Sequence, residues 1–269
     1  MTTITLTDAA IGTGLGAAVR PLTLRIGPGV PTAVSIEGDE RPLLVSMLLG
    51  GRLKPDSGEV SVDGDPSLDS LRRRTALVDT PMVAEPTAGA SLAVAVAEEF
   101  SFSSLSTSRR AVRRFLDEHG LAEYAGLPLR ALPSADRVRL FSELALLRPG
   151  VSALIVTSPE RHGGSPAEWY DSLAAIAERG ITIAVVTDAA TSDLLRSLGA
   201  SDAHFVAPEP EPADDEPTGD LDTSHLDETH FDPTDEVGTP ELGTHELSTP
   251  GLDTAPDTDT TDTTDKLTR

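Results

Sequence analysis

Two short, almost entirely apolar runs constrain the fold of this chain more than any other feature. They are ALIV (Ala153–Val156) and ITIAVV (Ile181–Val186). A strand with one exposed face alternates apolar and polar residues, whereas a strand buried on both faces is apolar throughout. Between the runs, Pro166–Arg179 has helical periodicity, and Gly180 follows it where a helix C-cap belongs. The pattern predicts two strands of a parallel sheet joined by a crossover helix.

The rest of the first 206 residues extends this alternation. Further β-like runs lie at Thr3–Leu6, Leu22–Ile26, Thr32–Ile36, Val60–Val62 and Thr75–Val78. Further helical patterns lie at Leu43–Leu49, Ser108–His119 (with Gly120 as its C-cap) and Asp136–Leu147. The stretch from about Thr87 to Ala131 holds no β-like run. We therefore expect one α/β domain over residues 1–206, with a helical subdomain inserted at about 87–147.

The charge of the chain is concentrated in its last part. The net charge is −23, and residues 207–269 hold 19 Asp or Glu against Lys266 and Arg269, a net charge of −17. This acidic segment is rich in Thr, Asp and Pro, as in PEPEPADDEP and DTDTTDTTD, and it is low-complexity without a recurring apolar face. It has too little apolar surface to offset the entropy of ordering. The sequence predicts a disordered acidic tail.

Composition excludes several classes of function. Residues 1–206 carry a net charge of −6 and no basic patch, so we expect no nucleic-acid partner. There is no cysteine, which excludes disulfides, thiolate catalysis and Cys-zinc sites. No apolar run approaches the roughly 20 residues of a membrane span, and MTTITLTDAA is not a signal peptide. We expect a cytoplasmic protein with no direct membrane insertion, held at the membrane only through a partner.

Five segments, in order, resemble the nucleotide-binding subunits of ABC transporters. They are GGRLKPDSGEVSVDG (Gly50–Gly64), LRRRTALVDTP (Leu71–Pro81), RRAVRRFLDEHGLAEYAGLPLRAL (Arg109–Leu132), ALIVTSPE (Ala153–Glu160) and RGITIAVVTD (Arg179–Asp188). The resemblance implies an ABC-ATPase fold, which is P-loop NTPase-like, with its helical subdomain. It also implies a membrane permease partner, and a homodimer or a heterodimer with a competent ABC ATPase subunit.

The expected phosphate loop departs from the family pattern. A Walker A loop, G-x-x-x-x-G-K-[ST], wraps phosphates with backbone N–H groups and a Lys. Here SIEGDERPLL (Ser35–Leu44) keeps one glycine and adds three carboxylates. Like charges at ~4 Å repel by ~4 kcal/mol near a surface, against ~0.3–1 kcal/mol of attraction from a helix N-terminus. The candidate cofactor-binding residues, as a degenerate phosphate loop, are Gly38, Asp39, Glu40, Arg41, Pro42, Leu43 and Leu44. Arg41 either replaces the Lys or is a solvated surface residue.

The other expected motifs of the family are also changed. Asp79-Thr80 stands at the glutamine loop, and Leu132-Pro133-Ser134-Ala135-Asp136 stands at the Leu-Ser-Gly-Gly-Gln signature. Thr157-Ser158 replaces the Walker B Asp-Glu that holds Mg²⁺ and water, and Asp188 replaces the switch histidine. Ala17–Val19 offers no ring to stack on adenine. We assign no catalytic residue and no metal ligand.

These changes predict a pseudo-ATPase, a structural or regulatory subunit of an ABC-type membrane transport complex with little or no ATP hydrolysis. ATP and Mg²⁺ would bind only if the degenerate site still holds nucleotide. One alternative is a functional ATPase subunit with an atypical nucleotide site. Another is a scaffold whose tail recruits partners and accepts phosphate on its threonines. The arginines of Arg109–Arg114 are either a solvated helix face or a dock for the acidic tail, and His225, His230 and His245 are either solvated or weak metal ligands.

Overall fold

A computed structural model describes residues 1–87 and 89–203 of the chain. The predicted acidic tail, residues 207–269 with its three histidines, lies outside the described residues. The strands are β1 (Ile4–Ile11), β2 (Val19–Ile26), β3 (Thr32–Ser35), β4 (Ser57–Val62), β5 (Thr75–Val78), β6 (Ala153–Thr157), β7 (Thr182–Thr187) and β8 (Ser201–Asp202). The helices are α1 (Arg41–Leu49), α2 (Leu68–Arg74), α3 (Leu92–Phe102), α4 (Arg109–Glu118), α5 (Ser134–Leu146), α6 (Pro166–Ala177) and α7 (Ala189–Ser197).

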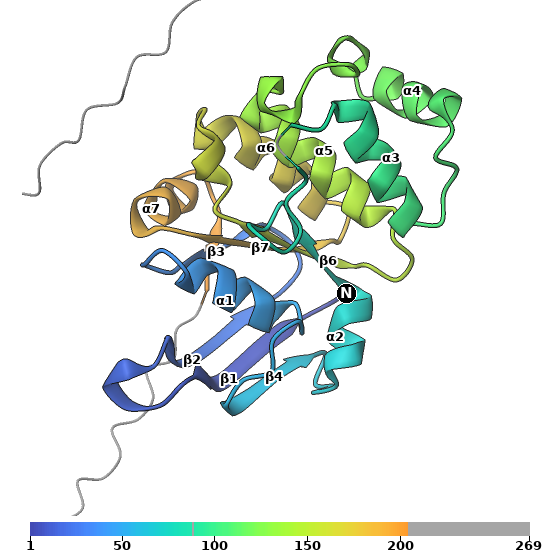
Figure 1. The fold of residues 1–269 in the computed structure, drawn as a ribbon. Helices are drawn as coiled ribbons and strands as arrows, with labels where there is room; N and C mark the ends of the chain where they lie inside the picture. The colour runs from blue at the N-terminus through green and yellow to red at the C-terminus, as the bar shows by residue number, and fades with distance from the viewer. Residues whose placement is uncertain (88, 204–269) are drawn as a thin grey trace, which may run out of the picture. The chain divides into compact units, whose positions relative to one another are not determined.

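The strands form two sheets. One is antiparallel with the order β2-β1-β4, and the other is parallel with the order β5-β6-β7-β3-β8. Helix α1 lies between the two sheets, while α5 and α6 cover the opposite face of the parallel sheet (Figure 1). The predicted α/β fold class is confirmed, and so is the parallel pairing of the two apolar runs that form β6 and β7.

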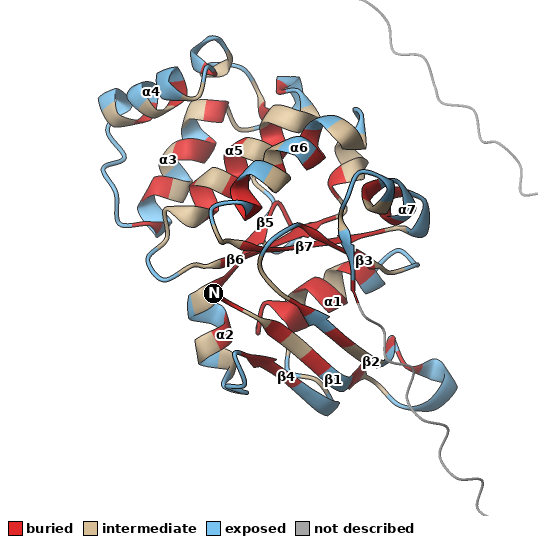
Figure 2. Cartoon of the chain, turned by 180° about the vertical axis from the view of Figure 1, so that it is seen from behind, coloured by how far each residue is buried: buried red, intermediate tan, exposed pale blue. Residues whose placement is uncertain are grey.

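The two faces of β6 and β7 belong to different cores, which explains why both strands are apolar. Leu154 and Val156 pack with α5 and α6, whereas Ala153 and Ile155 pack with α1 and the antiparallel sheet. Figure 2 shows these central strands buried and the outer faces of the helices exposed. Successive strand residues point to opposite faces, so a strand between two layers needs apolar residues at every position.

All seven predicted strands and all four predicted helices are present, and all but β5 (Thr75–Val78) have different bounds. Strand β1 runs to Ile11 rather than Leu6 because it continues past a bulge, where Asp8 has a φ of 48°. Helix α1 begins at Arg41 rather than Leu43, since proline fits the first turn of a helix. Helix α5 likewise begins at Ser134 rather than Asp136, with Pro133 as its N-cap residue.

The sequence did not predict α2, α7 or β8, and it gave no bounds for α3, which lies in the stretch without a β-like run. Of the three that were not predicted, α2 and α7 are short helices with much polar surface, and β8 has two residues at the edge of the parallel sheet. Such elements carry too little apolar periodicity to be recognised. Over the ranges that the structure describes, no helix combines the length and the apolar character that crossing a bilayer requires.

Candidate functional site

The candidate site lies at the carboxyl ends of the parallel strands, where ligands bind in open α/β sheets. Strand register places the ends of β3, β5, β6 and β7 at one edge, with Val78 opposite Val156 and Ser35 opposite Thr187. The residues that follow these ends are the phosphate-loop equivalent after β3, Asp79-Thr80 after β5, Ser158 after β6 and Asp188 after β7. The fold therefore brings together motifs that are far apart in the sequence.

The phosphate-loop equivalent is a turn that leads into α1. Gly38 has a φ of 110°, a conformation that glycine adopts without strain. Asp39, Glu40 and Arg41 are exposed, Leu43 and Leu44 are half-buried, and Pro42 is buried in the first turn of the helix, where it offers no N–H. The exposed carboxylates thus lie at the helix N-terminus, the end that attracts anions.

Two side chains tie this turn to its surroundings. The Arg41 Nε donates to the Ala18 carbonyl at 3.1 Å, and the Glu37 Oε1 accepts from the Ala189 N–H at 2.8 Å. Asp188, at the switch-histidine position, is the N-cap of α7 and accepts from the Thr191 N–H at 2.7 Å. Beside the turn is a cavity of about 200 Å³, lined by β2 and by residues including Ile36 and Val45. The loop and the switch position are held by contacts within the chain.

A chain of hydroxyl groups occupies the strand ends at the Walker B position. The Thr157 hydroxyl donates to the Ser46 Oγ at 2.8 Å and shares a hydrogen bond of 2.8 Å with the Thr80 hydroxyl. All three side chains are buried. Thr157 therefore uses its hydroxyl to join β6 to α1 and to the residue after β5.

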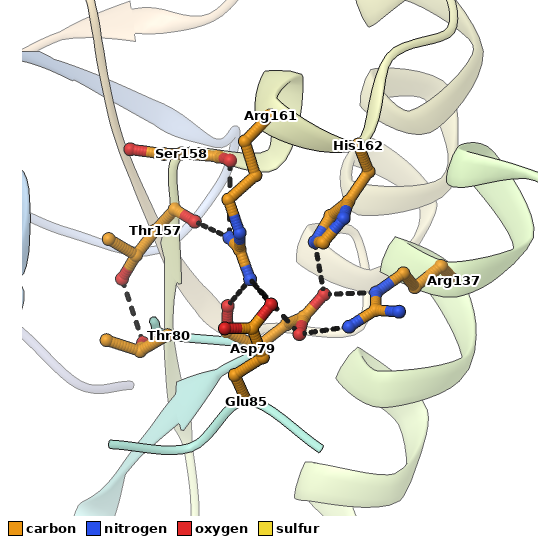
Figure 3. A network of polar contacts seen from close by, with 8 residues as sticks. All are labelled: Asp79, Thr80, Glu85, Arg137, Thr157, Ser158, Arg161 and His162. Carbon is orange, nitrogen blue, oxygen red and sulfur yellow. Dashed lines mark hydrogen bonds and ion pairs between the residues drawn. The ribbon is translucent and has the colours of Figure 1, made fainter. Parts of the chain in front are cut away.

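Asp79 is the centre of a buried ion-pair network (Figure 3). Arg137 of α5 donates to its carboxylate twice, Nε to Oδ2 at 2.6 Å and Nη2 to Oδ1 at 2.8 Å. The His162 Nε2 lies 2.8 Å from Oδ2, and the Arg161 Nη2 lies 3.2 Å from Oδ1. The Asp79 and Arg137 side chains are only 5% and 6% exposed. Burial raises the pKa of Asp79, but Arg137, His162 and Arg161 outweigh it and hold the pKa below its usual value.

Arg161 bridges the ends of β5 and β6. Its Nη1 donates to the Thr157 carbonyl at 2.7 Å, and its Nη2 donates to the Asp79 carbonyl and, at 3.3 Å, to Glu85. The ligand atoms of Asp79, Glu85 and His162 lie within 4.8 Å of one another. A cation among them would face the guanidinium groups of Arg137 and Arg161, so the cluster has the character of an ion-pair network rather than of a metal site.

Sequence reasoning placed Asp79, Thr80 and Thr157 at this edge but missed Arg137, Arg161 and Glu85. One signal in the sequence could have pointed to the counterion of Asp79. An Asp that directly follows a buried strand needs a cation if it is buried too. The basic residues nearest the other motifs are Arg137, one position after the signature equivalent, and Arg161. The sequence alone does not say which arginine pairs with which carboxylate.

Glu160 is a partly buried carboxylate at the same edge. Its Oε2 is buried and has no hydrogen-bond partner among the described residues. Burial raises its pKa, and the negative charge of Asp188 adds to the rise. A carboxyl group with a raised pKa in the folded state destabilises the fold at any pH where it must ionise, and does so no longer where it is protonated in both states.

The variant Glu160→Gln is therefore expected to raise the melting temperature near pH 8 and to leave it unchanged near pH 4, close to the pKa of about 4.3 of an unfolded glutamate. Thermal unfolding measured across this pH range checks it. Glu123→Gln, at an exposed position, serves as the control and should shift neither value. A lower melting temperature for Glu160→Gln at pH 8 would contradict the assignment.

Comparisons with known proteins give a fold. No protein-family model matches the chain. No curated protein matches it. Among solved structures, a nucleotide-free ATP-binding cassette from an ABC transporter is similar with a TM-score of 0.55 at 12% identity, covering 72% of this chain and 84% of the other. The dimeric bacterial ABC transporter cassette MJ0796 has a TM-score of 0.54 at 18% identity, with 71% and 90% covered.

A third structure agrees with these two. It is cbiO1 from Clostridium perfringens, part of the ABC transporter complex cbiONQ, with a TM-score of 0.50 at 20% identity, covering 69% of this chain and 78% of that one. Because the identities are low, the likeness concerns the backbone and not the site residues. Residues 1–203, as far as the structure describes them, have the fold of an ATP-binding cassette.

Proposed function

We propose that this chain is a non-hydrolysing ATP-binding-cassette subunit, with a structural or regulatory role in an ABC-type membrane transport complex. The observation that carries the proposal is which residues lie at the carboxyl ends of the parallel strands. The positions of the Walker B acids and the glutamine loop hold a buried hydroxyl chain and the Asp79 ion-pair network. The groups at these two positions are engaged with one another, so none of them supplies a carboxylate for Mg²⁺ or a base for water.

The loop before α1 supports the same proposal for nucleotide binding. The residues from Gly38 to Leu44 place two exposed carboxylates and a buried proline where a phosphate loop has amides and a lysine. Arg41, the one cation of the turn, is directed to the Ala18 carbonyl. For the alternative, a working ATPase, Arg41 would have to leave that contact and outweigh Asp39 and Glu40.

A groove beside this edge supports a partner role. Its volume is about 360 Å³, and it is lined by residues 83–87 after β5, by α3, and by Arg52 and Arg148. Val83 and Phe102 in its wall are 46% and 61% exposed. Burial and the charges of Arg148 and Arg72 lower the pKa of Arg52 to about 10, so it remains charged at neutral pH. Exposed apolar residues beside charged groups are typical of protein interfaces.

We place a permease subunit in this groove, with the chain at the cytoplasmic face of the membrane through that partner. The similar structure of cbiO1 belongs to a transporter complex, and MJ0796 is a dimer. By analogy, this chain pairs with itself or with a competent ATPase subunit. Permease contact rests on the groove, and the pairing rests on the fold alone.

The variant Phe102→Asp tests the permease contact. In cells of the native host, we expect the unchanged protein in the washed membrane pellet and most of Phe102→Asp in the supernatant, because a charge is added to the apolar wall of the groove. Leu15→Asp changes an apolar residue that is even more exposed, in the turn Gly14–Gly16, and this variant should stay in the pellet. Circular dichroism verifies that both variants fold. Equal distribution of Phe102→Asp and unchanged protein, or unchanged protein in the supernatant, would refute the contact.

A further inference from the structure

A second groove, on the far side of α3, has no role in the proposed function. It lies between α3 and α4, has a volume of about 520 Å³, and its apolar lining includes Val94, Val112 and Leu116. Arg109 and Arg113 stand in the same lining. Val94 is 58% exposed, so apolar surface on α3 is open to a ligand. A pocket of this size with an apolar floor and two cations suits a ligand that is apolar and anionic at once.

The positive charge of this surface is local. Helix α4 carries Arg109, Arg110, Arg113 and Arg114 within six positions, in a domain whose net charge is −6 over residues 1–206. Arg113 and Arg114 have only long, exposed contacts with Asp117 and Glu118, at 3.9 and 3.8 Å. For Arg109 and Arg110, no carboxylate within 4.0 Å is found in the described part of the chain. Exposed pairs of this kind contribute little, so the arginines can engage another anion.

The chain itself carries a sequence with the required chemistry. Between residues 220 and 253 there are ten Asp or Glu and no Lys or Arg. Apolar residues return through this stretch at steps of five, with a single step of six, as Leu221, Leu226, Phe231, Val237, Leu242, Leu247 and Leu252. All seven are next to an Asp or Glu in the sequence. Each repeat is thus a short acidic peptide with one apolar anchor.

We propose that the groove between α3 and α4 binds this repeat segment, residues 220–253, of the same chain. An apolar anchor enters the groove while the neighbouring carboxylates meet Arg109 and Arg113. Because tethering gives an effective concentration of about millimolar, and because seven similar anchors share one groove, weak individual contacts suffice. The rest of the domain repels the segment, since it is acidic overall.

The tether is long enough for this contact. The 17 residues between Ala203 and Leu221 can span roughly 60 Å when extended. A domain of about 200 residues is only about 43 Å across, from its expected radius of gyration. The later repeats have more chain at their disposal, so they can reach the groove even where the chain must run around the domain.

The absence of cysteine makes a direct test possible. A spin label on Thr229→Cys, between Leu226 and Phe231, is the only label that the full-length chain will take. In ¹⁵N-labelled protein we expect strong paramagnetic broadening of amides in α3 and α4. This broadening should fall several-fold in the variant Arg109→Glu/Arg113→Glu. It should fall likewise when Leu226 and Phe231 are replaced by serine, a change that leaves α4 intact. Arg25→Glu/Arg73→Glu, at exposed arginines outside the groove, is the matched control and should keep the broadening.

Three outcomes decide the proposal. Broadening confined to α3 and α4 that depends on both the arginines and the anchors supports it, and added salt should weaken the contact. Broadening that is spread evenly over the domain, or that persists in Arg109→Glu/Arg113→Glu, overturns it. A mixture of spin-labelled protein without ¹⁵N and ¹⁵N-labelled protein without a spin label reports only contacts between copies. If broadening of α3 and α4 in that mixture matches the broadening in the spin-labelled ¹⁵N protein, the occupant is the tail of a second copy and the proposal for the same chain is wrong.

Discussion

Replacing Asp79 by asparagine is expected to lower the free energy of unfolding by about 3–5 kcal/mol, the usual result of removing one partner from a buried ion pair. Asparagine has the same shape and tolerates the left-handed backbone that Asp79 adopts, with a φ of 50°. The change therefore removes the charge and little else. It leaves Arg137, which is 6% exposed, without a counterion, and it removes the carboxylate from Arg161 and His162.

Urea unfolding of the full-length protein at neutral pH measures this loss. The control is Glu143→Gln, which breaks the more exposed contact of Arg179 with Glu143, 2.7 Å long against 2.6 Å for Arg137 with Asp79, and should cost less than about 1 kcal/mol. If Asp79→Asn lowers the free energy of unfolding no more than the control does, the Asp79 ion-pair network contributes little to the fold. The interpretation of this network as structural would then be wrong.

The pH dependence of the difference in stability between unchanged protein and Asp79→Asn gives an independent result. The folded pKa of Asp79 is depressed, so its charge contributes stability above the pKa of about 3.9 of an unfolded aspartate. That contribution is lost as the pH falls through the folded value. The difference in unfolding free energy between unchanged protein and Asp79→Asn should therefore shrink as the pH falls from about 5 to below 4. A difference that grew over that range would contradict the sign of the shift.

Replacing Trp169 by alanine is expected to cost about 3–5 kcal/mol as well, because the cavity left by a large buried ring collapses only in part. Trp169 lies on α6, is 0% exposed, and packs in the core shared by α3–α6 and one face of the parallel sheet. The melting temperature should fall by roughly 10 °C for a domain of this size. Helix α5, which carries Arg137, packs against α6 in this core, so the site depends on it.

The variant Trp169→Phe separates packing from polarity. The indole Nε1 has no hydrogen-bond partner among the described residues, so phenylalanine removes an unsatisfied donor as well as part of the ring. We expect its cost to be less than half that of alanine, measured by calorimetry because each variant lacks the single Trp of the chain. Equal costs for the two variants would show that the indole N–H contributes through a bond that the geometry does not include.

The sequence predicted the parallel core because β6 and β7 are buried on both faces, and that requirement is written residue by residue in ALIV and ITIAVV. The antiparallel sheet was predicted as separate runs, each of which covers only part of its strand. Its strand β1 continues through a bulge at Asp8, opposite Gly58, where a Cβ would come within 2.1 Å of the Asp8 carbonyl oxygen. A bulge of this kind depends on the partner strand, and β1 and β4 are more than 40 residues apart.

The positions of the site were predictable, and its contacts were not. Alignment with the family pattern places Asp79, Thr157 and Asp188 at the ends of strands. In a parallel sheet those ends meet at one edge, so the three residues are expected near one another. The pairing of Asp79 with Arg137, 58 positions later, depends on how α5 packs against β5. Arg161 reaches the carbonyls of Thr157 and Asp79 through the turn Pro159–His162, which begins at Ser158 with a left-handed φ of 45°. Such contacts follow from tertiary packing.

The most direct test of the central claim is thermal unfolding of the full-length protein with and without several-millimolar Mg-ATP. A ligand at about 100 times its dissociation constant stabilises a fold by about 2.7 kcal/mol, which would raise the melting temperature by roughly 5–11 °C. We predict no shift, because the turn from Gly38 to Leu44 presents carboxylates and the strand ends are filled by the chain's own side chains. A rise of several degrees with Mg-ATP would contradict the account and would favour a working ATPase with an atypical nucleotide site.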